Sequence, residues 1–288
     1  MKHLNLVDLE KSDIKYQIHR FPDGQQSITL LPPSAPEDLQ QVVIDSRFNS
    51  FKDLELIICA NQALRNVGAA AVGLHVPYFL GSRSDRRFEF ASVNYLKQVI
   101  CPIINAQKFD VVITLDPHSD VLEACIDRYE KAPNFPVVKY ALKEIDNRDG
   151  AQDRICLVSP DAGAYKKIFD VAKEFNIENI VTANKVRDLK TGNILRTEVP
   201  NLPQNQDLKY VIVDDICDGG RTFVELAKVI KEQRPNAEIY LIVTHGIFSA
   251  GFETLTQYFN GIFCTNSVKD ITDDEYEVKT KTKTFNVY

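Results

Sequence analysis

The sequence predicts an α/β protein made of two successive halves, each built around a mostly parallel sheet. Short apolar, β-branched runs alternate with longer segments in which apolar residues recur at helical spacing, a pattern typical of repeated strand and helix units. A Pro-containing stretch, residues 131–137, interrupts this periodicity near mid-chain and is the predicted boundary. The expected domains are residues 1–133 and residues 134–288, with helices flanking each sheet.

The short apolar runs predict the individual strands, and the segments with helical spacing predict the helices. Strands are expected at residues 70–76, 111–115, 155–158, 210–213 and 239–243. Helices are expected at residues 53–67, 93–104, 119–128, 165–175 and 222–233. The segment 184–206 is long and polar and shows no periodic element, which is typical of a lid or a disordered insertion.

Composition narrows the class of protein. The 288 residues include 44% hydrophobic and 26% charged residues, which is typical of a globular protein with a substantial core. The acidic excess, with a net charge of -6 and no long Lys/Arg block, argues against a nucleic-acid surface. Six scattered cysteines without zinc-site spacing are expected to be reduced thiols. Neither a secretory signal nor a membrane-spanning run is expected, so the predicted location is the cytoplasm.

The strongest functional signal is an apolar strand that leads into two acids and then into a glycine turn before a helix. Its residues are Asp214, Asp215, Asp218, Gly219, Gly220, Arg221 and Thr222. Acids at the carboxyl end of a strand can hold ribose hydroxyls or Mg2+, while turn amides and a helix amino terminus favour phosphate. The structural alternative is an acidic loop in which Asp218 or Thr222 caps the helix. The adjacent acids together with the glycine turn favour a binding site.

This segment resembles the phosphoribosyl-diphosphate loop of type I phosphoribosyltransferases, and further stretches narrow the resemblance to ribose-phosphate pyrophosphokinases. These stretches follow that family's order over nearly the whole chain: Arg-Phe-Pro-Asp-Gly-Gln at 20–25, Pro-Tyr-Phe-Leu-Gly-Ser-Arg-Ser-Asp-Arg at 77–86, Asp-Pro-His at 116–118, Ser-Pro-Asp-Ala-Gly at 159–163, Lys-Val-Arg at 185–187 and Thr-His-Gly-Ile-Phe-Ser at 244–249. No single stretch is decisive, but the ordered set is specific.

The resemblance implies two tandem type I phosphoribosyltransferase-like domains. It also implies transfer of the β,γ-pyrophosphoryl group of Mg-ATP to the anomeric hydroxyl of ribose 5-phosphate. The implied ATP-binding residues are Phe21, Asp23, Gln25, Arg83, Ser84, Asp85 and Arg86. Because the first three would hold the adenine of ATP bound mainly by a neighbouring subunit, a homo-oligomer is expected, either a dimer or a hexamer.

The remaining roles implied by the resemblance concern the metal, the sugar and the lid. His118 and Asp161 would stand at the Mg2+ and phosphate region, and residues 214–222 would hold the ribose hydroxyls and the 5-phosphate. Lys185 and Arg187 would close over the reacting phosphates, with His118 as a further catalytic residue. Such transfers depend on positioning and charge neutralisation, and a closing cationic lid would exclude water. Taken alone, without the resemblance, Lys185 and Arg187 are better explained as solvated loop charges.

The glycine turn departs from the family pattern, in which Asp-Thr-Gly/Cys-Gly-Thr is usual. Gly219 removes a hydroxyl that would bond a terminal phosphate, and Arg221 adds a planar cation suited to a further phosphate group. We therefore consider ADP-ribose as an acceptor, because its 5-phosphate is esterified while its anomeric hydroxyl is free. The alternative is that Arg221 turns outward and ribose 5-phosphate is still accepted. Gln25, Ser84 and residues 120–122 also depart from the family residues.

Two competing functions remain. A phosphoribosyltransferase that acts on a base would share the acidic glycine loop, but it would not need the stretches around Phe21 and Arg83. A noncatalytic regulatory homologue would be expected to lose the lid cations or the acid pair, yet all of these residues are present.

Overall fold

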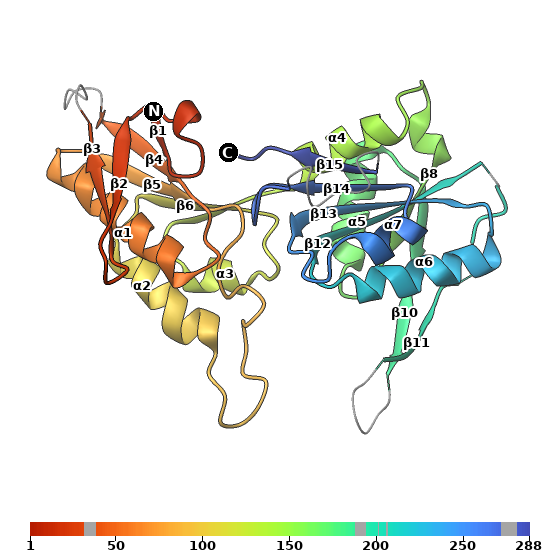
Figure 1. The fold of residues 1–288 in the computed structure, drawn as a ribbon. Coiled ribbons are helices and arrows are strands. Elements are labelled where there is room, and N and C mark those ends of the chain that lie inside the picture. Colours follow the sequence, from red (N-terminus) through yellow and green to blue (C-terminus); the bar gives the residue numbers. More distant parts are fainter. Residues whose placement is uncertain (32–38, 188–193, 201, 206, 272–280) are drawn as a thin grey trace. The chain divides into compact units, whose positions relative to one another are not determined.

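The computed structural model divides into two compact units. It describes residues 1–31, 39–187, 194–200, 202–205, 207–271 and 281–288. Unit 1 comprises Met1–Pro133 and Val287–Tyr288, and unit 2 comprises Asn134–Asn286. Each unit contains one parallel sheet (Figure 1). Val287 and Tyr288 therefore belong to unit 1, whereas the sequence placed every residue after 133 in the second domain.

The sheet of unit 1 has five parallel strands in the order β1-β4-β5-β6-β7. These strands are β1 (Lys2–Asn5), β4 (Gln41–Asp45), β5 (Ala71–His75), β6 (Val111–Leu115) and β7 (Tyr129–Ala132). Alternate residues of the central strands, such as Val42 and Ile44, belong to the same buried cluster as residues of the helices. The expected strands around 70–76 and 111–115 are confirmed, while the sequence-based prediction did not include β1, β4 and β7.

The helices of unit 1 are α1 (Phe51–Asn66), α2 (Cys101–Ala106) and α3 (Val121–Cys125), and a π-helical turn, Leu96–Ile100, precedes α2. At the start of α1, the Ser50 hydroxyl accepts from the Asp53 N–H while the Asp53 carboxylate accepts from the Ser50 N–H. This reciprocal cap satisfies two of the unpaired amides at the helix start. The expected helix over 119–128 is wrong in length, because residues after Cys125 turn into β7.

The sheet of unit 2 has six parallel strands in the order β15-β14-β13-β12-β8-β9. These strands are β8 (Ile155–Ser159), β9 (Asn179–Thr182), β12 (Lys209–Cys217), β13 (Glu238–Gly246), β14 (Gly261–Thr265) and β15 (Thr282–Phe285). The central strand β12 pairs with β13 on one side and β8 on the other. Both of its faces are buried, since Val211 and Ile212 are each 0% exposed.

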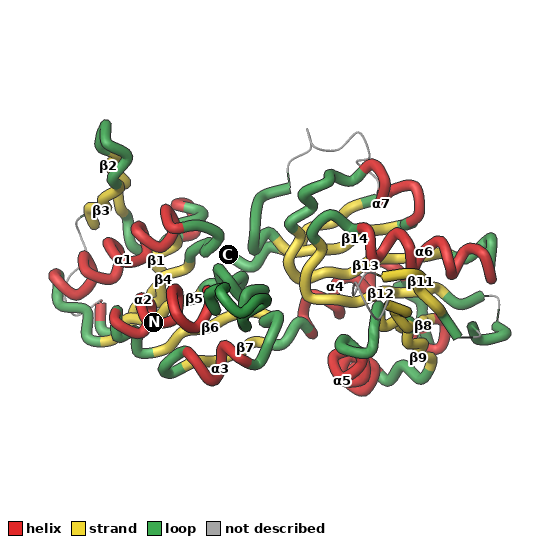
Figure 2. The backbone as a smooth tube through the Cα atoms, turned by 90° about the horizontal axis from the view of Figure 1, so that it is seen from below, coloured by secondary structure: helices red, strands yellow, loops and turns green. Residues whose placement is uncertain are grey.

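Helices cover both faces of this second sheet. These helices are α4 (Phe135–Ile145), α5 (Tyr165–Phe175), α6 (Arg221–Gln233) and α7 (Glu253–Tyr258). Helices α6 and α7 share one buried cluster with alternate residues of β12, and Figure 2 shows α5 and α7 on opposite sides of the sheet. Burial on both faces explains why the strands appear in the sequence as continuous apolar runs. The expected helices at 165–175 and 222–233 are confirmed.

Two segments contain regular structure that the sequence-based prediction did not include. The boundary stretch 131–137 contains the start of α4, with Pro136 in its first turn, where proline is well tolerated because its missing N–H has no helical partner. The segment 184–206 is also not without regular structure, since β10 (Asn184–Arg187) pairs antiparallel with β11 (Ile194–Glu198). A second antiparallel hairpin, β2 (Tyr16–Arg20) with β3 (Gln26–Leu30), projects from unit 1 (Figure 2).

Within the described ranges, no helix is long and apolar enough to cross a membrane.

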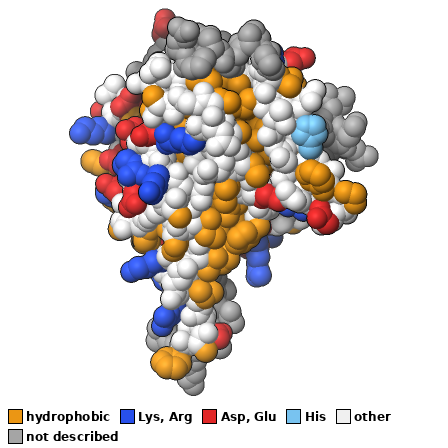
Figure 3. Space-filling view, turned by 90° about the vertical axis from the view of Figure 1, so that its left-hand side faces the viewer, with side chains coloured by type: hydrophobic (Ala, Val, Ile, Leu, Met, Phe, Trp, Pro, Cys, Tyr) orange, Lys and Arg blue, Asp and Glu red, His pale blue; other side chains and the backbone are white. Residues whose placement is uncertain are grey.

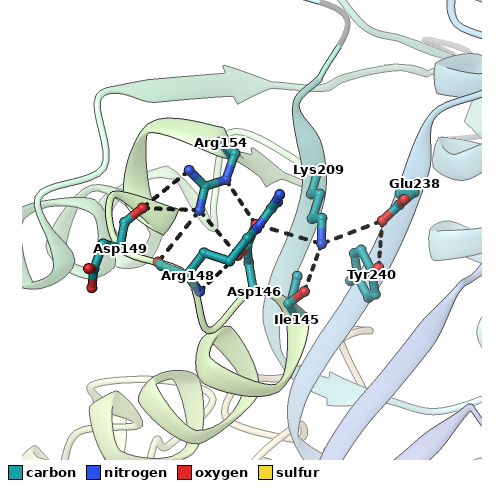
Figure 4. Close-up of polar contacts among 8 residues, drawn as sticks. All are labelled: Ile145, Asp146, Arg148, Asp149, Arg154, Lys209, Glu238 and Tyr240. Atoms are coloured by element: carbon teal, nitrogen blue, oxygen red, sulfur yellow. Dashed lines mark hydrogen bonds and ion pairs between the residues drawn. The ribbon is translucent and has the colours of Figure 1, made fainter.

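A buried carboxylate organises the amino-terminal edge of the unit 2 sheet (Figure 4). The side chain of Asp146, only 1% exposed, accepts from Arg148 Nη2 at 2.6 Å and from Arg154 Nε at 3.0 Å. Lys209, the first residue of β12, lies 3.8 Å from the same carboxylate and 3.7 Å from Glu238 at the start of β13. The Arg148 and Arg154 hydrogen bonds hold the pKa of Asp146 far below its usual range. This cluster ties the end of α4 to the starts of two central strands.

We predict that Asp146→Asn lowers the free energy of unfolding by about 2 kcal/mol at neutral pH, because the partly buried cations of Arg154 and Lys209 lose their counter-charge. The depressed pKa means that this stabilisation is present above the unfolded pKa of about 4 and is lost as pH falls below it. The difference between wild type and variant should therefore shrink in acid. Urea unfolding followed by circular dichroism measures it.

Asp149→Asn is the matched control, because Asp149 contributes its backbone carbonyl to Arg154 and its side chain is exposed. That variant should unfold within about 0.5 kcal/mol of wild type. Equal urea midpoints for the two variants would show that the cluster does not stabilise unit 2.

Candidate active site

Three neighbouring strands of unit 2 end at the same edge of the sheet. Strands β8, β12 and β13 are adjacent and parallel, so the loops that follow them meet at one edge. These loops carry the segments 159–163, 218–222 and 247–251. Ligands of open α/β sheets bind in this position, outside the carboxyl ends of the strands.

The acid pair lies inside β12, which corrects the expectation that the strand ends before it. Asp214 pairs in register with Val243, and β12 continues to Cys217. The Asp215 N–H donates to Asp214 Oδ1 at 2.9 Å. Burial, followed by the neighbouring Asp215 carboxylate, raises the pKa of Asp214 well above its usual range. The continued pairing holds both acids on a rigid strand.

A lysine that sequence reasoning did not single out approaches this pair. Lys167, in the first turn of α5, places Nζ 3.7 Å from Asp215 Oδ1. Its charge acts to lower the pKa of Asp214, although burial and Asp215 outweigh it. The available signal was its position soon after the segment 159–163, but nothing in the sequence indicates which strand its side chain reaches.

The glycine turn leads directly into α6. Gly220 is the N-cap, with a φ of 77° and no side-chain hydrogen bond to the helix. The N-cap residue is therefore Gly220 and not Asp218 or Thr222. A Cβ at Gly220 would lie 2.9 Å from the Leu255 side chain, so both conformation and space require glycine. The uncapped amides at this end are suited to an anion.

Gly219 is exposed and differs from Gly220 in its surroundings. Its φ lies outside the left-handed region, and a Cβ built there would meet only Ser249 Oγ at 3.7 Å and Ala250 Cβ at 3.9 Å. These are ordinary van der Waals distances, so a side chain at 219 is sterically feasible. Arg221 begins α6 and is also exposed.

The segment 159–163 forms a compact turn beside the acid pair. The Ser159 hydroxyl donates to the Asp161 carbonyl at 2.7 Å, and Asp161 Oδ1 accepts from the Ala164 N–H at 3.1 Å. Asp161 remains half-buried at the sheet edge. Its carboxylate thus lies in unit 2 with Asp214 and Asp215, as the motif order suggested.

The residues expected at ATP lie in unit 1. Arg83, Ser84, Asp85 and Arg86 belong to the loop after β5, and His118 follows β6, so both segments leave the same edge of that sheet. Between β6 and His118, Asp116 has a φ of 43° and is buried. A left-handed aspartate at a strand end is a strained conformation of the kind found at functional sites.

The hairpin that carries Phe21, Asp23 and Gln25 has a defined turn. The Phe21 N–H donates to the Gln25 carbonyl at 2.9 Å, and Asp23 Oδ1 accepts from the Gln25 N–H at 3.1 Å. Next to the turn, the Gln26 amide group donates to the Lys52 carbonyl at 2.8 Å, which anchors the hairpin on the first turn of α1. Phe21 is 50% exposed.

Lys185 and Arg187 lie in β10, opposite Thr197 and Ile194 of β11. The side chains of these two cations lie outside the described part of the structure. Their backbone belongs to a hairpin rather than to an irregular loop, and β11 contacts α6, the helix that begins at the glycine turn.

A dedicated metal cage is absent from the described residues, which contain no group of three or more His, Cys, Asp or Glu side chains suited to a metal. Mg2+ commonly binds through one or two carboxylates together with substrate phosphates and water. Asp161 is a hard oxygen donor at the correct edge of unit 2 and fits that mode, whereas His118 belongs to unit 1.

Comparison with known proteins gives consistent matches. Residues 126–274 match the model of the phosphoribosyl transferase domain. A ribose-phosphate pyrophosphokinase of Cereibacter sphaeroides is 30% identical over 239 residues, which cover 81% of this chain and 67% of that protein. Another, from Vibrio parahaemolyticus, is 27% identical over 235 residues, covering 81% of this chain and 71% of that protein.

The fold also matches a solved structure. The crystal structure of phosphoribosylpyrophosphate synthetase from Mycobacterium smegmatis superposes with a TM-score of 0.75 at 16% identity, covering 97% of this chain and 88% of that one. The expected α/β fold with two sheets is confirmed by this match.

Proposed function

Because this chain belongs to the ribose-phosphate pyrophosphokinase family, we propose that it transfers the β,γ-pyrophosphoryl group of Mg-ATP to the anomeric hydroxyl of a ribose 5-phosphate unit and releases AMP. The observation that carries this proposal is the arrangement in unit 2. Asp214 and Asp215 sit on a rigid strand, and an uncapped helix start follows them after the Gly219–Gly220 turn.

Each part of that arrangement suits one part of a sugar phosphate. Carboxylates accept hydrogen bonds from ribose hydroxyls, and the free amides at the start of α6 suit the 5-phosphate. In the reaction, the anomeric oxygen attacks the β-phosphorus of ATP in line. The bond from that phosphorus to the oxygen bridging it to the α-phosphorus breaks, and AMP leaves with this oxygen. The proton of the anomeric hydroxyl passes to solvent.

The chain would contribute positioning and charge rather than covalent chemistry. Asp161 in unit 2 and His118 in unit 1 are the residues we propose to contact Mg2+ or phosphate, each within its own unit. Mg2+ would supply charge neutralisation on the phosphates. Lys185 and Arg187 would close from β10 over the transferred group, which would exclude water and spare ATP from hydrolysis.

Two acceptors fit the proposal. Ribose 5-phosphate is the acceptor suggested by the family. An esterified acceptor, with ADP-ribose as the natural candidate, is favoured by Gly219, which lacks a hydroxyl for a terminal phosphate, and by the exposed Arg221 beside it. A guanidinium at a helix start is suited to a second phosphate group.

On the ATP side, we propose that Phe21, Asp23 and Gln25 contact adenine in a neighbouring subunit's site, while residues 83–86 line the nucleotide site of their own subunit. The hairpin's exposed apolar side chains support a homo-oligomer. Hydrophobic side chains run down the face of unit 1 seen in Figure 3. The exposed large hydrophobics of unit 1 are Met1, Leu9, Ile18, Phe21, Phe51, Val67, Phe88, Phe90 and Val93.

The deciding experiment incubates the full chain with Mg-ATP and either ribose 5-phosphate or ADP-ribose. We expect AMP and a pyrophosphorylated sugar in equal amounts, identified by ion-exchange chromatography and mass spectrometry, and no AMP without acceptor or after EDTA treatment. Consumption of phosphoribosyl pyrophosphate with a base would instead indicate a phosphoribosyltransferase. Binding of both substrates without AMP release would indicate a noncatalytic homologue.

We predict that Lys185→Ala lowers kcat by about 100-fold, the size expected when one stabilising donor is removed from a transition state. The KM for the acceptor should change much less, because the acceptor is held by the acid pair and the glycine turn. Steady-state AMP release measures both.

Lys173→Ala serves as the matched control, because it removes an exposed cation from the last turn of α5, away from the sheet edge. It should retain wild-type turnover. Near-normal AMP release by Lys185→Ala would remove this lysine from the mechanism.

We further predict that Gly219→Thr shifts the ratio of kcat/KM values at least about fivefold toward ribose 5-phosphate and away from ADP-ribose, since a hydroxyl regained near the phosphate is worth about 1 kcal/mol. The substitution should fold, because a Cβ there has no neighbour closer than 3.7 Å.

Gly220→Ala is the contrasting variant. Its added Cβ would meet Leu255 at 2.9 Å in a left-handed conformation, so it should weaken both acceptors alike. An unchanged acceptor ratio in Gly219→Thr would show that residue 219 does not set the choice.

A further inference from the structure

A serine hydroxyl organises a turn in the loop after β5 in unit 1. Ser92 Oγ accepts from the N–H groups of Phe88 and Glu89, at 3.0 Å each, and donates to the Glu89 carbonyl at 2.8 Å. The Ser92 N–H also donates to the Glu89 carbonyl, at 3.1 Å. These hydrogen bonds close residues 88–92 into a defined turn.

Two further hydrogen bonds close the base of the loop that carries this turn. The Asn94 side-chain amide donates to the Asp85 carbonyl at 2.7 Å, and the Leu96 N–H donates to the Ser84 carbonyl at 3.2 Å. The start of the loop is therefore held against its end, where the π-helical turn before α2 begins. The turn at 88–92 lies on a loop whose two ends are bonded to each other.

Two phenylalanines of this turn are open to solvent. Phe88 is 62% exposed, and Phe90 is fully exposed. The Arg86 guanidinium lies over the Phe88 ring, with Cζ 5.7 Å from the ring centroid, which is the range of a cation–π contact. Exposure of two aromatic rings to water costs free energy that a covering ligand would recover.

The residues that precede the rings indicate what kind of ligand would cover them. Arg83, Arg86 and Arg87 come shortly before Phe88 in the chain, and all three are exposed. Guanidinium groups suit phosphate oxygens, whereas aromatic faces suit nucleobases. A nucleotide has both of these parts. An apolar protein surface would match the two rings but not the three cations beside them.

We infer that Phe88 and Phe90 form an aromatic platform for the adenine of ATP, with the arginines of the same loop on the phosphate side. This inference rests on the proposed function, in which residues 83–86 line the nucleotide site. It extends that site by two residues and gives the base a contact within the same subunit, in addition to the hairpin of a neighbouring subunit.

The test compares calorimetric binding of Mg-ATP and of magnesium tripolyphosphate to the full chain. Tripolyphosphate has the anionic part of ATP without the base. We expect the double variant Phe88→Ala/Phe90→Ala to raise the Kd of ATP about tenfold, the loss expected when base stacking is removed. Its Kd for tripolyphosphate should stay within about twofold of wild type, because the arginines remain.

Two control variants accompany the double variant. Phe88→Tyr/Phe90→Tyr keeps both rings and should bind ATP within about threefold of wild type, because the aromatic faces remain. Val67→Ala removes an exposed apolar side chain of the same unit at the end of α1, outside the loop. It should leave both Kd values unchanged.

Three results would overturn the inference. The first is an unchanged Kd of ATP in the folded double variant. The second is an equal rise in the Kd values of ATP and tripolyphosphate, which would place the effect on the phosphates or on the fold of the loop. The third is slower sedimentation of the double variant than of wild type, which would show that the rings pack against a second copy of the chain.

AMP release separates this inference from the proposed function. If the double variant binds ATP more weakly as expected, but wild type releases no AMP with either acceptor, the proposed function fails and the aromatic platform stands. If wild type releases AMP and the double variant has an unchanged KM for ATP, only the inference fails. If wild type does not bind ATP, both fail.

Discussion

The pairing of β12 between β8 and β13 is the constraint on which the candidate site depends. Tyr210 pairs with Cys156 on one side and Ile239 on the other, and pairing with β13 continues through Cys217. Because the three strands are parallel, their following loops meet at one edge of the sheet. Because β12 extends beyond its apolar run, the Asp214 and Asp215 carboxylates are held on a strand rather than on a loop.

Charge at this edge is balanced by elements that are distant in the sequence. Asp214, Asp215 and Asp218 come from β12 and the turn after it. Lys167 reaches Asp215 from α5, and the uncapped start of α6 offers amides in the same region. The raised pKa of Asp214 shows that burial and the neighbouring acid outweigh the lysine. At this edge, a bound sugar phosphate would contact carboxylates that lie close to a lysine and to backbone amides.

The polar groups at the two edges of the unit 2 sheet differ in their partners. At the amino-terminal edge, Asp146 binds Arg148 and Arg154, so its charge is neutralised inside the protein (Figure 4). At the carboxyl edge, Gly219, Arg221 and Ser249 are exposed. At the amino-terminal edge, the polar groups bind one another and stabilise the fold. Binding is expected where groups remain open to a ligand.

The sequence alone determined the α/β class, the positions of α5 and α6, and the motifs of the candidate site, because these features depend on local periodicity and on residues close together in the chain. Tertiary structure alone decided that Asp214 and Asp215 lie within a strand, that Lys167 approaches Asp215 and that Ser249 binds Asp218. It also decided the β10–β11 hairpin and the addition of strands β14 and β15 to the sheet beyond β13. Those features depend on pairing and packing between segments that are distant in the sequence. The periodicity of apolar residues within one segment does not indicate which other segment will pack against it.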